Sequence, residues 1–436
     1  MNTDPFLKQM IKAVQDRRGS TGAIMASDFH KYQWGVPIPH LMMEYLFGLN
    51  VIPHPCIIEL AGLPKSCKSA FLQALLRLFA EKSYGAIMIE TEGKMSSTLL
   101  ASFLEEYLSQ VAIVPGPLLQ EEWQTEMLST LKLYRKFYVD SLKAYEKAQK
   151  AKKSTDGIMV SPLLLCLDSL GGSPSQSSVD TVNKAGSADR AFPVEALKNK
   201  IFFEQLPTRI RDLPLTLVYT NHEKPEGMGE TKTFGPPAPK ERKTKGGVTP
   251  DFFCGLRIFF EQATKVQEVG GRFRQNLNLE VCKNSFNRSG TRIQLTMEWT
   301  TAIDTATNKL TQHTQFLWNK ALAQWLAPSY DGYNYDREAV KKFLTVTRAS
   351  DVKYSCKELK LTDVPPEVIG DAIEANAEIK NKLRPYMGIK TWNTWAGHPF
   401  SANVTEDVDL PDPQDVQSQE PFQLDDPPEK PEPNTP

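Results

Sequence analysis

Residues 62–69 read Gly-Leu-Pro-Lys-Ser-Cys-Lys-Ser and constrain this chain more than any other segment. They match the phosphate-binding loop G-x-x-x-x-G-K-[ST] at every defined position except the second glycine, which is Cys67. The apolar run 56–61 before the loop predicts a strand, and the run 70–76 after it predicts a helix. A tight loop between a strand and a helix N-terminus aims backbone N–H groups at a phosphate. The segment therefore predicts a nucleotide site in an α/β fold.

The residue types in this loop predict individual roles. Lys68 would reach the β- and γ-phosphates of a nucleotide, and the Ser69 hydroxyl would ligate Mg²⁺. The other residues expected to surround the nucleotide are Gly62, Leu63, Pro64, Lys65, Ser66 and Cys67. A side chain at a loop position that needs positive φ costs about 1–2 kcal/mol. Cys67 therefore leaves two interpretations open, a competent loop or a damaged one.

The composition is that of a globular chain. Its length of 436 residues is enough for two or three domains, and 40% of the residues are hydrophobic. No stretch approaches the ~20 unbroken apolar residues of a membrane helix. The first residues show no signal-peptide pattern. The six scattered cysteines form no C-x-x-C pair and predict reduced thiols that act as small hydrophobic residues. We therefore expect a cytoplasmic protein with no membrane partner.

Charge is distributed unevenly along the chain. Residues 401–436 are rich in proline and hold ten Asp or Glu and one basic residue, Lys430, so this tail carries −9. Because the net charge is −1, residues 1–400 carry +8. A basic body with an acidic tail predicts an anionic partner with which the tail competes. The alternative is a tail that only keeps the protein soluble.

We expect four regions: an N-terminal arm with a polymerisation helix (1–50), an α/β core (51–309), a largely helical C-terminal domain (310–400) and a disordered acidic tail (401–436). Apolar residues from Trp123 to Tyr145, spaced by three and four, predict a long helix docked on the core sheet. Strand-like runs first alternate with helices and then follow one another directly. This order predicts a mostly parallel central sheet flanked by helices, with an antiparallel edge. The runs are 56–61, 86–90, 163–168, 215–220, 256–260, 277–282 and 291–298.

Three of these runs end in groups suited to nucleotide hydrolysis. The run 163–168 ends in Asp168, the carboxylate expected to hold Mg²⁺. Glu92 follows the run 86–90, and ligands bind at the carboxyl ends of parallel strands, so Glu92 is predicted to position or deprotonate the attacking water. Asn221 and His222 follow the run 215–220 and predict a contact with the γ-phosphate. At each position the alternative is a purely structural or solvated strand end.

Two long polar segments follow these strands. Residues 223–250 show little periodicity and contain five glycines and a cluster of four cations at 240–245. Basic charge with backbone freedom suits the phosphate backbone of a nucleic acid. The expected contacts are Lys240, Arg242, Lys243 and Lys245, with Phe234 stacking on or wedging between bases. Residues 171–190 are a second predicted DNA loop, and the alternative for both is a surface excursion without a ligand.

The order of these segments resembles a known family. The phosphate loop is followed by Ile-Glu-Thr-Glu-Gly (89–93), Leu-Asp-Ser-Leu-Gly (167–171), Thr-Asn-His (220–222) and Lys-Gly-Gly (245–247). Over about residues 20–300 the chain resembles the RecA-type strand-exchange recombinases, and most of all their tailed-bacteriophage, UvsX-like branch. In that branch the loop also carries a bulky residue where Cys67 stands. The acidic tail is similar as well.

This resemblance implies an ATP- and Mg²⁺-dependent filament on single-stranded DNA that searches double-stranded DNA during recombination, repair and replication. The nucleotide would bind between neighbouring subunits. If the protein is viral, it would act in the host cell cytoplasm. Glu92 would be the catalytic carboxylate, and His222 would link nucleotide to DNA. Gly246 and Gly247 would end the DNA loop 223–250. Lys283, or else Arg288, would reach the γ-phosphate of the neighbouring subunit. Single-strand-binding and mediator proteins are further implied partners.

Two other functions remain open for a fold of this kind. One is a catalytically weak RecA-fold mediator of recombination, which Cys67 favours and which the intact Lys68, Ser69, Asp168 and Glu92 disfavour. The other is a hexameric RecA-fold helicase, which would also present DNA loops at this sheet edge. Residues 310–400 match no motif to which chemistry can be assigned.

Overall fold

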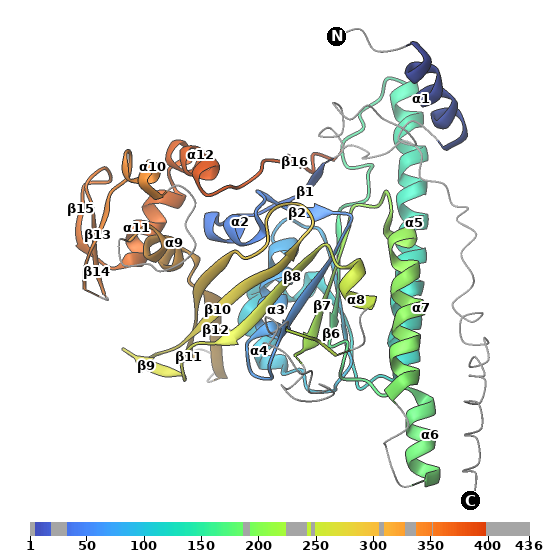
Figure 1. The fold of residues 1–436 in the computed structure, drawn as a ribbon, viewed down its shortest axis with the longest axis horizontal. Helices are drawn as coiled ribbons and strands as arrows, with labels where there is room; N and C mark the ends of the chain where they lie inside the picture. The colour runs from blue at the N-terminus through green and yellow to red at the C-terminus, as the bar shows by residue number, and fades with distance from the viewer. Residues whose placement is uncertain are drawn as a thin grey trace, which may run out of the picture.

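The computed structural model describes residues 5–18, 33–185, 192–223, 242–245, 249–304, 309–327, 337–350 and 352–397. Within these ranges a ten-stranded sheet forms the centre of the molecule (Figure 1). Its strands follow in the order β12 (Lys309–Phe316), β11 (Arg292–Asp304), β10 (Arg272–Asn284), β8 (Leu256–Gln262), β3 (Cys56–Gly62), β7 (Leu215–His222), β6 (Leu163–Asp168), β4 (Gly85–Glu90) and β5 (Val111–Val114), and β9 (Gln267–Val269) pairs with β10.

The strands from β8 to β5 run parallel, whereas those from β12 to β8 run antiparallel. The predicted α/β class is thereby confirmed, with its mostly parallel core and antiparallel edge. All seven predicted strand runs are strands, and several extend further than predicted. The phosphate loop therefore follows a central strand, β3, at the edge where the parallel strands end.

Helices cover both faces of the parallel half of the sheet, as β6 illustrates. Leu164 and Cys166 point to one side, towards α3 (Lys68–Ala80) and α4 (Ser97–Leu104), and a short 3-10 turn (Glu105–Gln110) follows α4. Leu163, Leu165 and Leu167 point to the other side, towards α5 (Gln120–Lys150) and α7 (Phe192–Ile210). A strand buried on both faces is apolar at nearly every position. Two short helices, α6 (Gln176–Ala185) and α8 (Thr249–Phe253), complete this part.

The long helix α5 confirms the predicted apolar stripe. The buried residues along it are Trp123, Met127, Leu131, Tyr134, Tyr138, Leu142 and Tyr145. The Tyr134 hydroxyl donates hydrogen bonds to the carbonyl oxygens of Ser161 and Pro214, at 2.8 and 3.1 Å. These carbonyls lie just before β6 and β7, so the helix fixes where both strands begin.

The structure differs from the boundary predicted at residue 50. Strand β1 (Trp34–Pro37) pairs with β2 (Val51–His54) and with β16 (Asn393–Thr394), and every residue of α2 (Leu41–Phe47) is buried. The buried Glu44 pairs with Arg384 of the C-terminal region at 2.7 Å. Residues 33–50 therefore belong to the packed body, while α1 (Pro5–Arg18) lies at its periphery (Figure 1).

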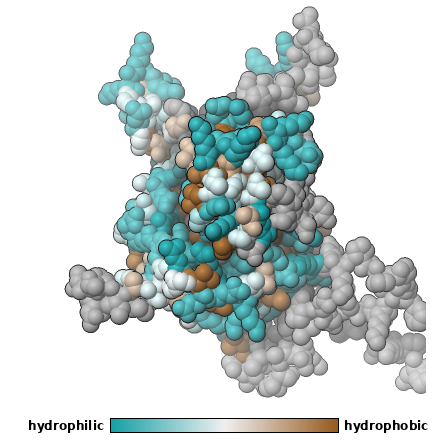
Figure 2. Space-filling view, turned by 90° about the vertical axis from the view of Figure 1, so that its left-hand side faces the viewer, coloured by the Kyte–Doolittle hydropathy of each residue, from teal (hydrophilic) through white to brown (hydrophobic). Residues whose placement is uncertain are grey.

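The C-terminal region is less helical than predicted, and the expected boundary at 310 falls inside β12. The region contains α9 (Trp318–Leu326), α10 (Arg337–Lys341), α11 (Pro366–Glu374) and α12 (Ala377–Tyr386), and also β13 (Val346–Ser350), β14 (Lys353–Cys356) and β15 (Leu361–Val364). These strands are too short to give a clear alternating pattern, and β14 is held by its buried Tyr354 and Cys356. The face that this region presents is mostly hydrophilic, with small apolar patches (Figure 2).

All six cysteines are free thiols; Cys56, Cys166, Cys254 and Cys356 are buried, and Cys282 is exposed. In the parts of the chain that the structure describes, no helix combines the length and apolar character needed to cross a membrane. The predicted acidic tail, residues 401–436, lies outside the described residues.

Candidate nucleotide site

The loop between β3 and α3 has the backbone that the motif predicts. Cys67 caps the N-terminus of α3 with φ 65° and ψ 23°, and Lys65 has a φ of 66°. Both residues lie in the left-handed region, which glycine occupies without steric cost. Gly62 accepts no side chain, because a Cβ there would lie 2.3 Å from the carbonyl oxygen of Phe260. Cys67 therefore keeps the conformation for which the motif uses glycine.

The thiol of Cys67 is accommodated beside the loop. Its Sγ donates a hydrogen bond to Gln275 Oε1 at 3.5 Å. Burial raises the pKa of the thiol to about 11, although the nearby Lys68 ammonium lowers it. The thiol is therefore neutral at pH 7 and brings no negative charge to the loop.

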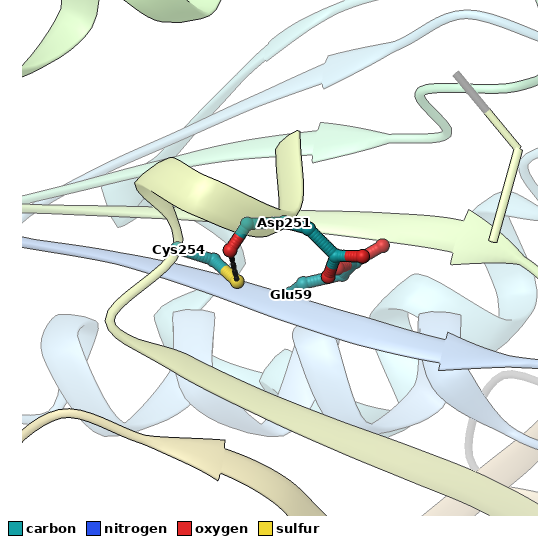
Figure 3. Close-up of side chains that lie close together, drawn as sticks. All are labelled: Glu59, Asp251 and Cys254. Carbon is teal, nitrogen blue, oxygen red and sulfur yellow. Dashed lines mark hydrogen bonds between the residues drawn. The ribbon is translucent and has the colours of Figure 1, made fainter. Parts of the chain in front are cut away.

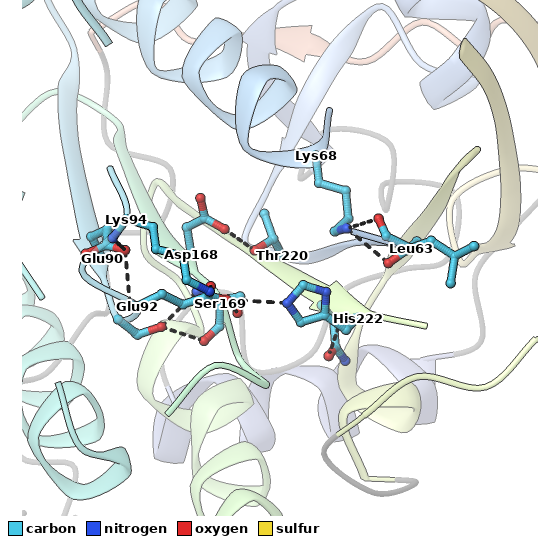
Figure 4. Close-up of polar contacts among 12 residues, drawn as sticks. Leu63, Lys68, Glu90, Glu92, Lys94, Asp168, Ser169, Thr220 and His222 are labelled. Carbon is cyan, nitrogen blue, oxygen red and sulfur yellow. Dashed lines mark hydrogen bonds and ion pairs between the residues drawn. The ribbon is translucent and has the colours of Figure 1, made fainter. Parts of the chain in front are cut away.

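Lys68 folds back over its own loop (Figure 4). Its Nζ donates to the carbonyl oxygens of Gly62 and Leu63 at 3.0 and 2.8 Å, and the residue is buried. Burial lowers the pKa of Lys68, while the Asp168 and Glu92 carboxylates raise it. A buried ammonium gains most from an ionised partner, so an anionic oxygen would be a stronger acceptor than either carbonyl.

Ser69 and Asp168, the predicted Mg²⁺ ligands, lie against each other. The carboxylate of Asp168 accepts hydrogen bonds from the hydroxyls of Thr220 and Ser69. Burial raises the pKa of Asp168, and these two hydrogen bonds lower it. A hydroxyl and a carboxylate beside a phosphate loop are the oxygen ligands that Mg²⁺ takes together with substrate phosphates. The residues present therefore fit a Mg²⁺-bound nucleoside triphosphate.

The two carboxylates at the end of β4, Glu90 and Glu92, have different surroundings. Glu90 is buried and accepts hydrogen bonds from the backbone N–H groups of Glu92, Gly93, Lys94 and Gly116 at 2.8 to 3.2 Å. It thereby fixes the turn that carries Glu92. The role predicted for Glu92, positioning or deprotonating the attacking water, stays a prediction.

Glu92 is held by three groups at the sheet edge (Figure 4). Its Oε1 accepts from Ser169 Oγ at 2.6 Å and lies 3.4 Å from His222 Nε2. Lys94 Nζ donates to its Oε2 at 2.8 Å. Burial raises the pKa of Glu92, but the hydrogen bonds from Lys94, Ser169 and His222 outweigh it and bring the pKa to about 2.

The backbone opposite Glu92 is glycine for a steric reason. A Cβ on Gly172 would lie 2.5 Å from Glu92 Cγ. Gly172 belongs to the loop after β6, the first part of the predicted DNA loop 171–190. The position of the Glu92 carboxylate is therefore tied to the position of that loop.

His222 lies at the end of β7, between the strand of the phosphate loop and the strand of Asp168. Burial lowers its pKa, as does the charge of Lys68, and the hydrogen bond with Glu92 opposes them. The backbone N–H of Lys245 donates to the His222 carbonyl at 2.9 Å. His222 therefore connects the Glu92 carboxylate with the described part of the predicted DNA loop 223–250.

The residues predicted to contact DNA differ in their exposure and in their ion pairs. Lys243 and Lys245 are exposed. Arg242 instead lies 3.7 Å from Glu223 and 3.5 Å from Glu261, over the ring of Phe259. The other predicted contacts lie outside the described residues: Phe234, Lys240, Gly246 and Gly247.

Lys283 and Arg288 are not brought to the phosphate loop of their own chain. In the sheet, Lys283 of β10 lies opposite Arg257 near the start of β8, whereas the loop follows the end of the parallel strand β3. Its Nζ donates to the carbonyl oxygens of Asp251 and Phe252. Arg288 follows β10 and hydrogen-bonds with Tyr45. A contact of either cation with a γ-phosphate stays a prediction that needs a neighbouring subunit.

A second cluster of ligand-type groups lies under the sheet edge. The side chains of Glu59, Asp251 and Cys254 lie within 4.8 Å of one another (Figure 3). Arg257 forms ion pairs with both carboxylates, and burial raises the pKa of Cys254 to about 12. The one guanidinium offsets one of the two negative charges. Because Glu59 and Arg257 are buried while the Asp251 side chain is 38% exposed, this cluster is a partly buried ion-pair network. Its Glu59 accepts a hydrogen bond from Asn221 at 2.8 Å and so supports the end of β7.

Four residues of the site were not predicted: Lys94, Ser169, Gly172 and Thr220. Lys94, Ser169 and Thr220 each stand one or two residues from a predicted site residue, and Ser169 and Thr220 lie inside the quoted motif segments. Gly172 lies in the predicted loop 171–190. Their proximity along the chain was the signal. Which of them turns towards Glu92 or Asp168 depends on turns that the sequence pattern does not specify.

Comparison with known proteins leaves the family open. No protein-family model matches this chain, and no curated protein matches it either. The geometry of the site and the resemblance in motif order therefore carry the functional assignment.

Proposed function

We propose that this protein is an ATP-dependent DNA strand-exchange recombinase that forms filaments on single-stranded DNA. One observation carries the proposal: the groups that phosphoryl transfer to water requires meet at one edge of the sheet. They are the Lys68 ammonium, the Ser69 and Asp168 oxygens, the Glu92 carboxylate and the His222 imidazole.

Nucleotide binding begins at the loop. Lys68 Nζ would exchange the carbonyl oxygens of Gly62 and Leu63 for β- and γ-phosphate oxygens. The N–H groups at the start of α3 would face the same phosphates. Ser69 and Asp168 would hold Mg²⁺, which would supply positive charge beside the phosphates when bound.

Hydrolysis needs a group that orients the attacking water, and Glu92 has that role in this proposal. Its carboxylate is ionised at pH 7 because its pKa is about 2. Ser169 and the turn held by the buried Glu90 fix its direction. A carboxylate held in this way positions water and accepts its proton as the phosphoryl group leaves.

The proposal for DNA rests on the loops beside the site. Lys245 is exposed, and its backbone is hydrogen-bonded to His222, so DNA bound there would be coupled to the nucleotide through His222. In a filament, Lys283 or Arg288 of the next subunit would complete the γ-phosphate contacts. Cys67 keeps the loop conformation, which removes the main support for a catalytically weak mediator.

Electron microscopy with circular single-stranded DNA and ATP tests this proposal. We expect continuous helical filaments and, with homologous duplex added, joint DNA molecules. Lys68→Ala, which loses the phosphate contact, should form neither with ATP. Discrete rings that unwind duplex DNA would replace the recombinase with the helicase alternative, and an absence of ATP-dependent DNA binding would reject both.

A further inference from the structure

We propose that Lys94 restrains Glu92 in a resting position, and that a phosphodiester group of DNA entering the adjacent cavity draws Lys94 away and thereby starts hydrolysis. This inference rests on the proposed function, because it names how DNA would control the Glu92 carboxylate. Lys94 is a positioning residue here, since it acts through Glu92.

The cavity lies where the turn after β4, the loop after β6 and the start of α5 meet. It has a volume of about 410 Å³, and its lining includes Glu92, Lys94, Gly171, Gly172, His222 and Lys245. The lining also includes Glu122, whose carboxylate accepts a hydrogen bond from the backbone N–H of Leu119 at 2.7 Å. Two ammonium groups thus share the cavity with two carboxylates, of which Glu92 is the one that Lys94 contacts. The described lining contains no Phe, Tyr or Trp on which a base could stack. The chemistry favours a phosphate group as the ligand.

Lys94 is the one of the three groups on Glu92 that can leave easily. Its side chain is 79% exposed, whereas that of Glu92 is 19% exposed. Ser169 is buried and exchanges hydrogen bonds with Thr91, so it stays with the sheet edge. An exposed Lys–Glu pair contributes little and is screened by salt. A polyanion that offers several phosphates can therefore compete for the Lys94 ammonium.

Removing the ammonium would change what Glu92 can do. Lys94 occupies Oε2, the oxygen that Ser169 and His222 leave free. It also contributes to the lowered pKa of the carboxylate. A carboxylate with a lower pKa is a weaker base, and proton transfer to it is less efficient. Departure of Lys94 would both free an oxygen for water and strengthen the base.

Lys245 supplies the second contact for the same phosphate. A Cβ built on Gly171 would lie 3.2 Å from Cδ of Lys245, so the lysine stem packs against the loop after β6. Its backbone N–H is bonded to His222. Both described DNA-loop segments therefore place this cation at the cavity that holds Lys94.

The test compares ATP hydrolysis by Lys94→Met, Lys94→Arg and wild type, with and without poly(dT). We expect Lys94→Met to raise kcat without DNA about two- to fivefold, the range that an exposed ion pair supplies. The fold-stimulation by poly(dT) should fall by the same factor. Lys94→Arg keeps the ion pair and should restore the wild-type ratio. Lys382→Met is the matched control, because it breaks an exposed Lys–Glu pair of 2.6 Å on α12, away from this site.

A pH profile of kcat without DNA gives a readout that a merely structural role would not move. The titratable groups that surround Glu92 are Lys94, His222, Lys68, Asp168, Glu90, Glu122 and Lys245. Because Lys94 lowers the pKa of Glu92, the acid limb should move to higher pH in Lys94→Met and stay in place in Lys382→Met. If wild type is stimulated by DNA while Lys94→Met matches Lys382→Met in rate and profile, the restraint is refuted. If wild type hydrolyses no ATP at all, the proposed function itself fails, and the restraint falls with it.

Discussion

Replacing Cys67 with glycine and with alanine isolates the backbone strain in the phosphate loop. Both variants lose Sγ and its hydrogen bond to Gln275, so these losses cancel when the two are compared. At φ 65°, alanine keeps a Cβ that costs about 1–2 kcal/mol. Glycine instead costs about 0.4–1 kcal/mol through the greater freedom of the unfolded chain. The midpoints of these two ranges predict that Cys67→Gly is more stable than Cys67→Ala by about 0.8 kcal/mol.

Urea unfolding followed by tryptophan fluorescence measures this difference as a shift in midpoint at constant slope. The same pair of variants tests the loop's function, because glycine preserves the left-handed backbone. We expect the KM for ATP of Cys67→Gly to stay within about threefold of wild type, since a change of 1.4 kcal/mol in binding would be needed for tenfold. Equal or greater stability of Cys67→Ala would refute the assignment of strain to position 67.

Three further changes test separate contacts. Gly172→Ala would push a Cβ against Glu92, and a displacement of about 1 Å should lower kcat roughly 100-fold with an unchanged urea midpoint; a normal kcat would contradict this packing. Thr220→Val removes a hydroxyl donor from Asp168, whose pKa is already raised by burial. An Asp168 that has lost this donor should hold Mg²⁺ less well, so hydrolysis should need a higher Mg²⁺ concentration; an unchanged Mg²⁺ dependence of the rate would argue against that bond. Arg257→Met leaves the buried Glu59 carboxylate without its cation and should destabilise the protein by about 3–5 kcal/mol in urea; a loss under about 1 kcal/mol would contradict a buried Glu59–Arg257 pair.

The parallel core could be predicted because its signals are local and strong. Its strands are continuous apolar runs bounded by turns, and α5 repeats its apolar stripe over many turns. The pairing of β1 with β16 could not be predicted, since it joins Trp34 and Gly35 to a two-residue strand at 393–394. Such short segments carry no periodicity, and only the packed body brings them together.

The residues of the site also fall into those that the sequence predicts and those that it does not. Asp168, Glu92 and His222 follow from a general rule, that ligands bind where parallel strands end. The roles of Lys94 and Gly172 do not follow from it, because they depend on the direction of a turn that the buried Glu90 holds. Lys283 and Arg288 depend on a second subunit, and no pattern within one chain fixes that geometry.

The central claim is that Glu92 acts on water at a nucleotide site controlled by DNA. Steady-state ATP hydrolysis by wild type and by Glu92→Gln, each with and without single-stranded DNA, tests it most directly. Gln keeps the size of the side chain and removes its charge, so we expect DNA-stimulated hydrolysis in wild type and a roughly 10²–10⁴-fold lower rate in the variant. ATP-dependent DNA binding should persist in both proteins. Full hydrolysis in Glu92→Gln, or no stimulation of wild type by DNA, would contradict the claim.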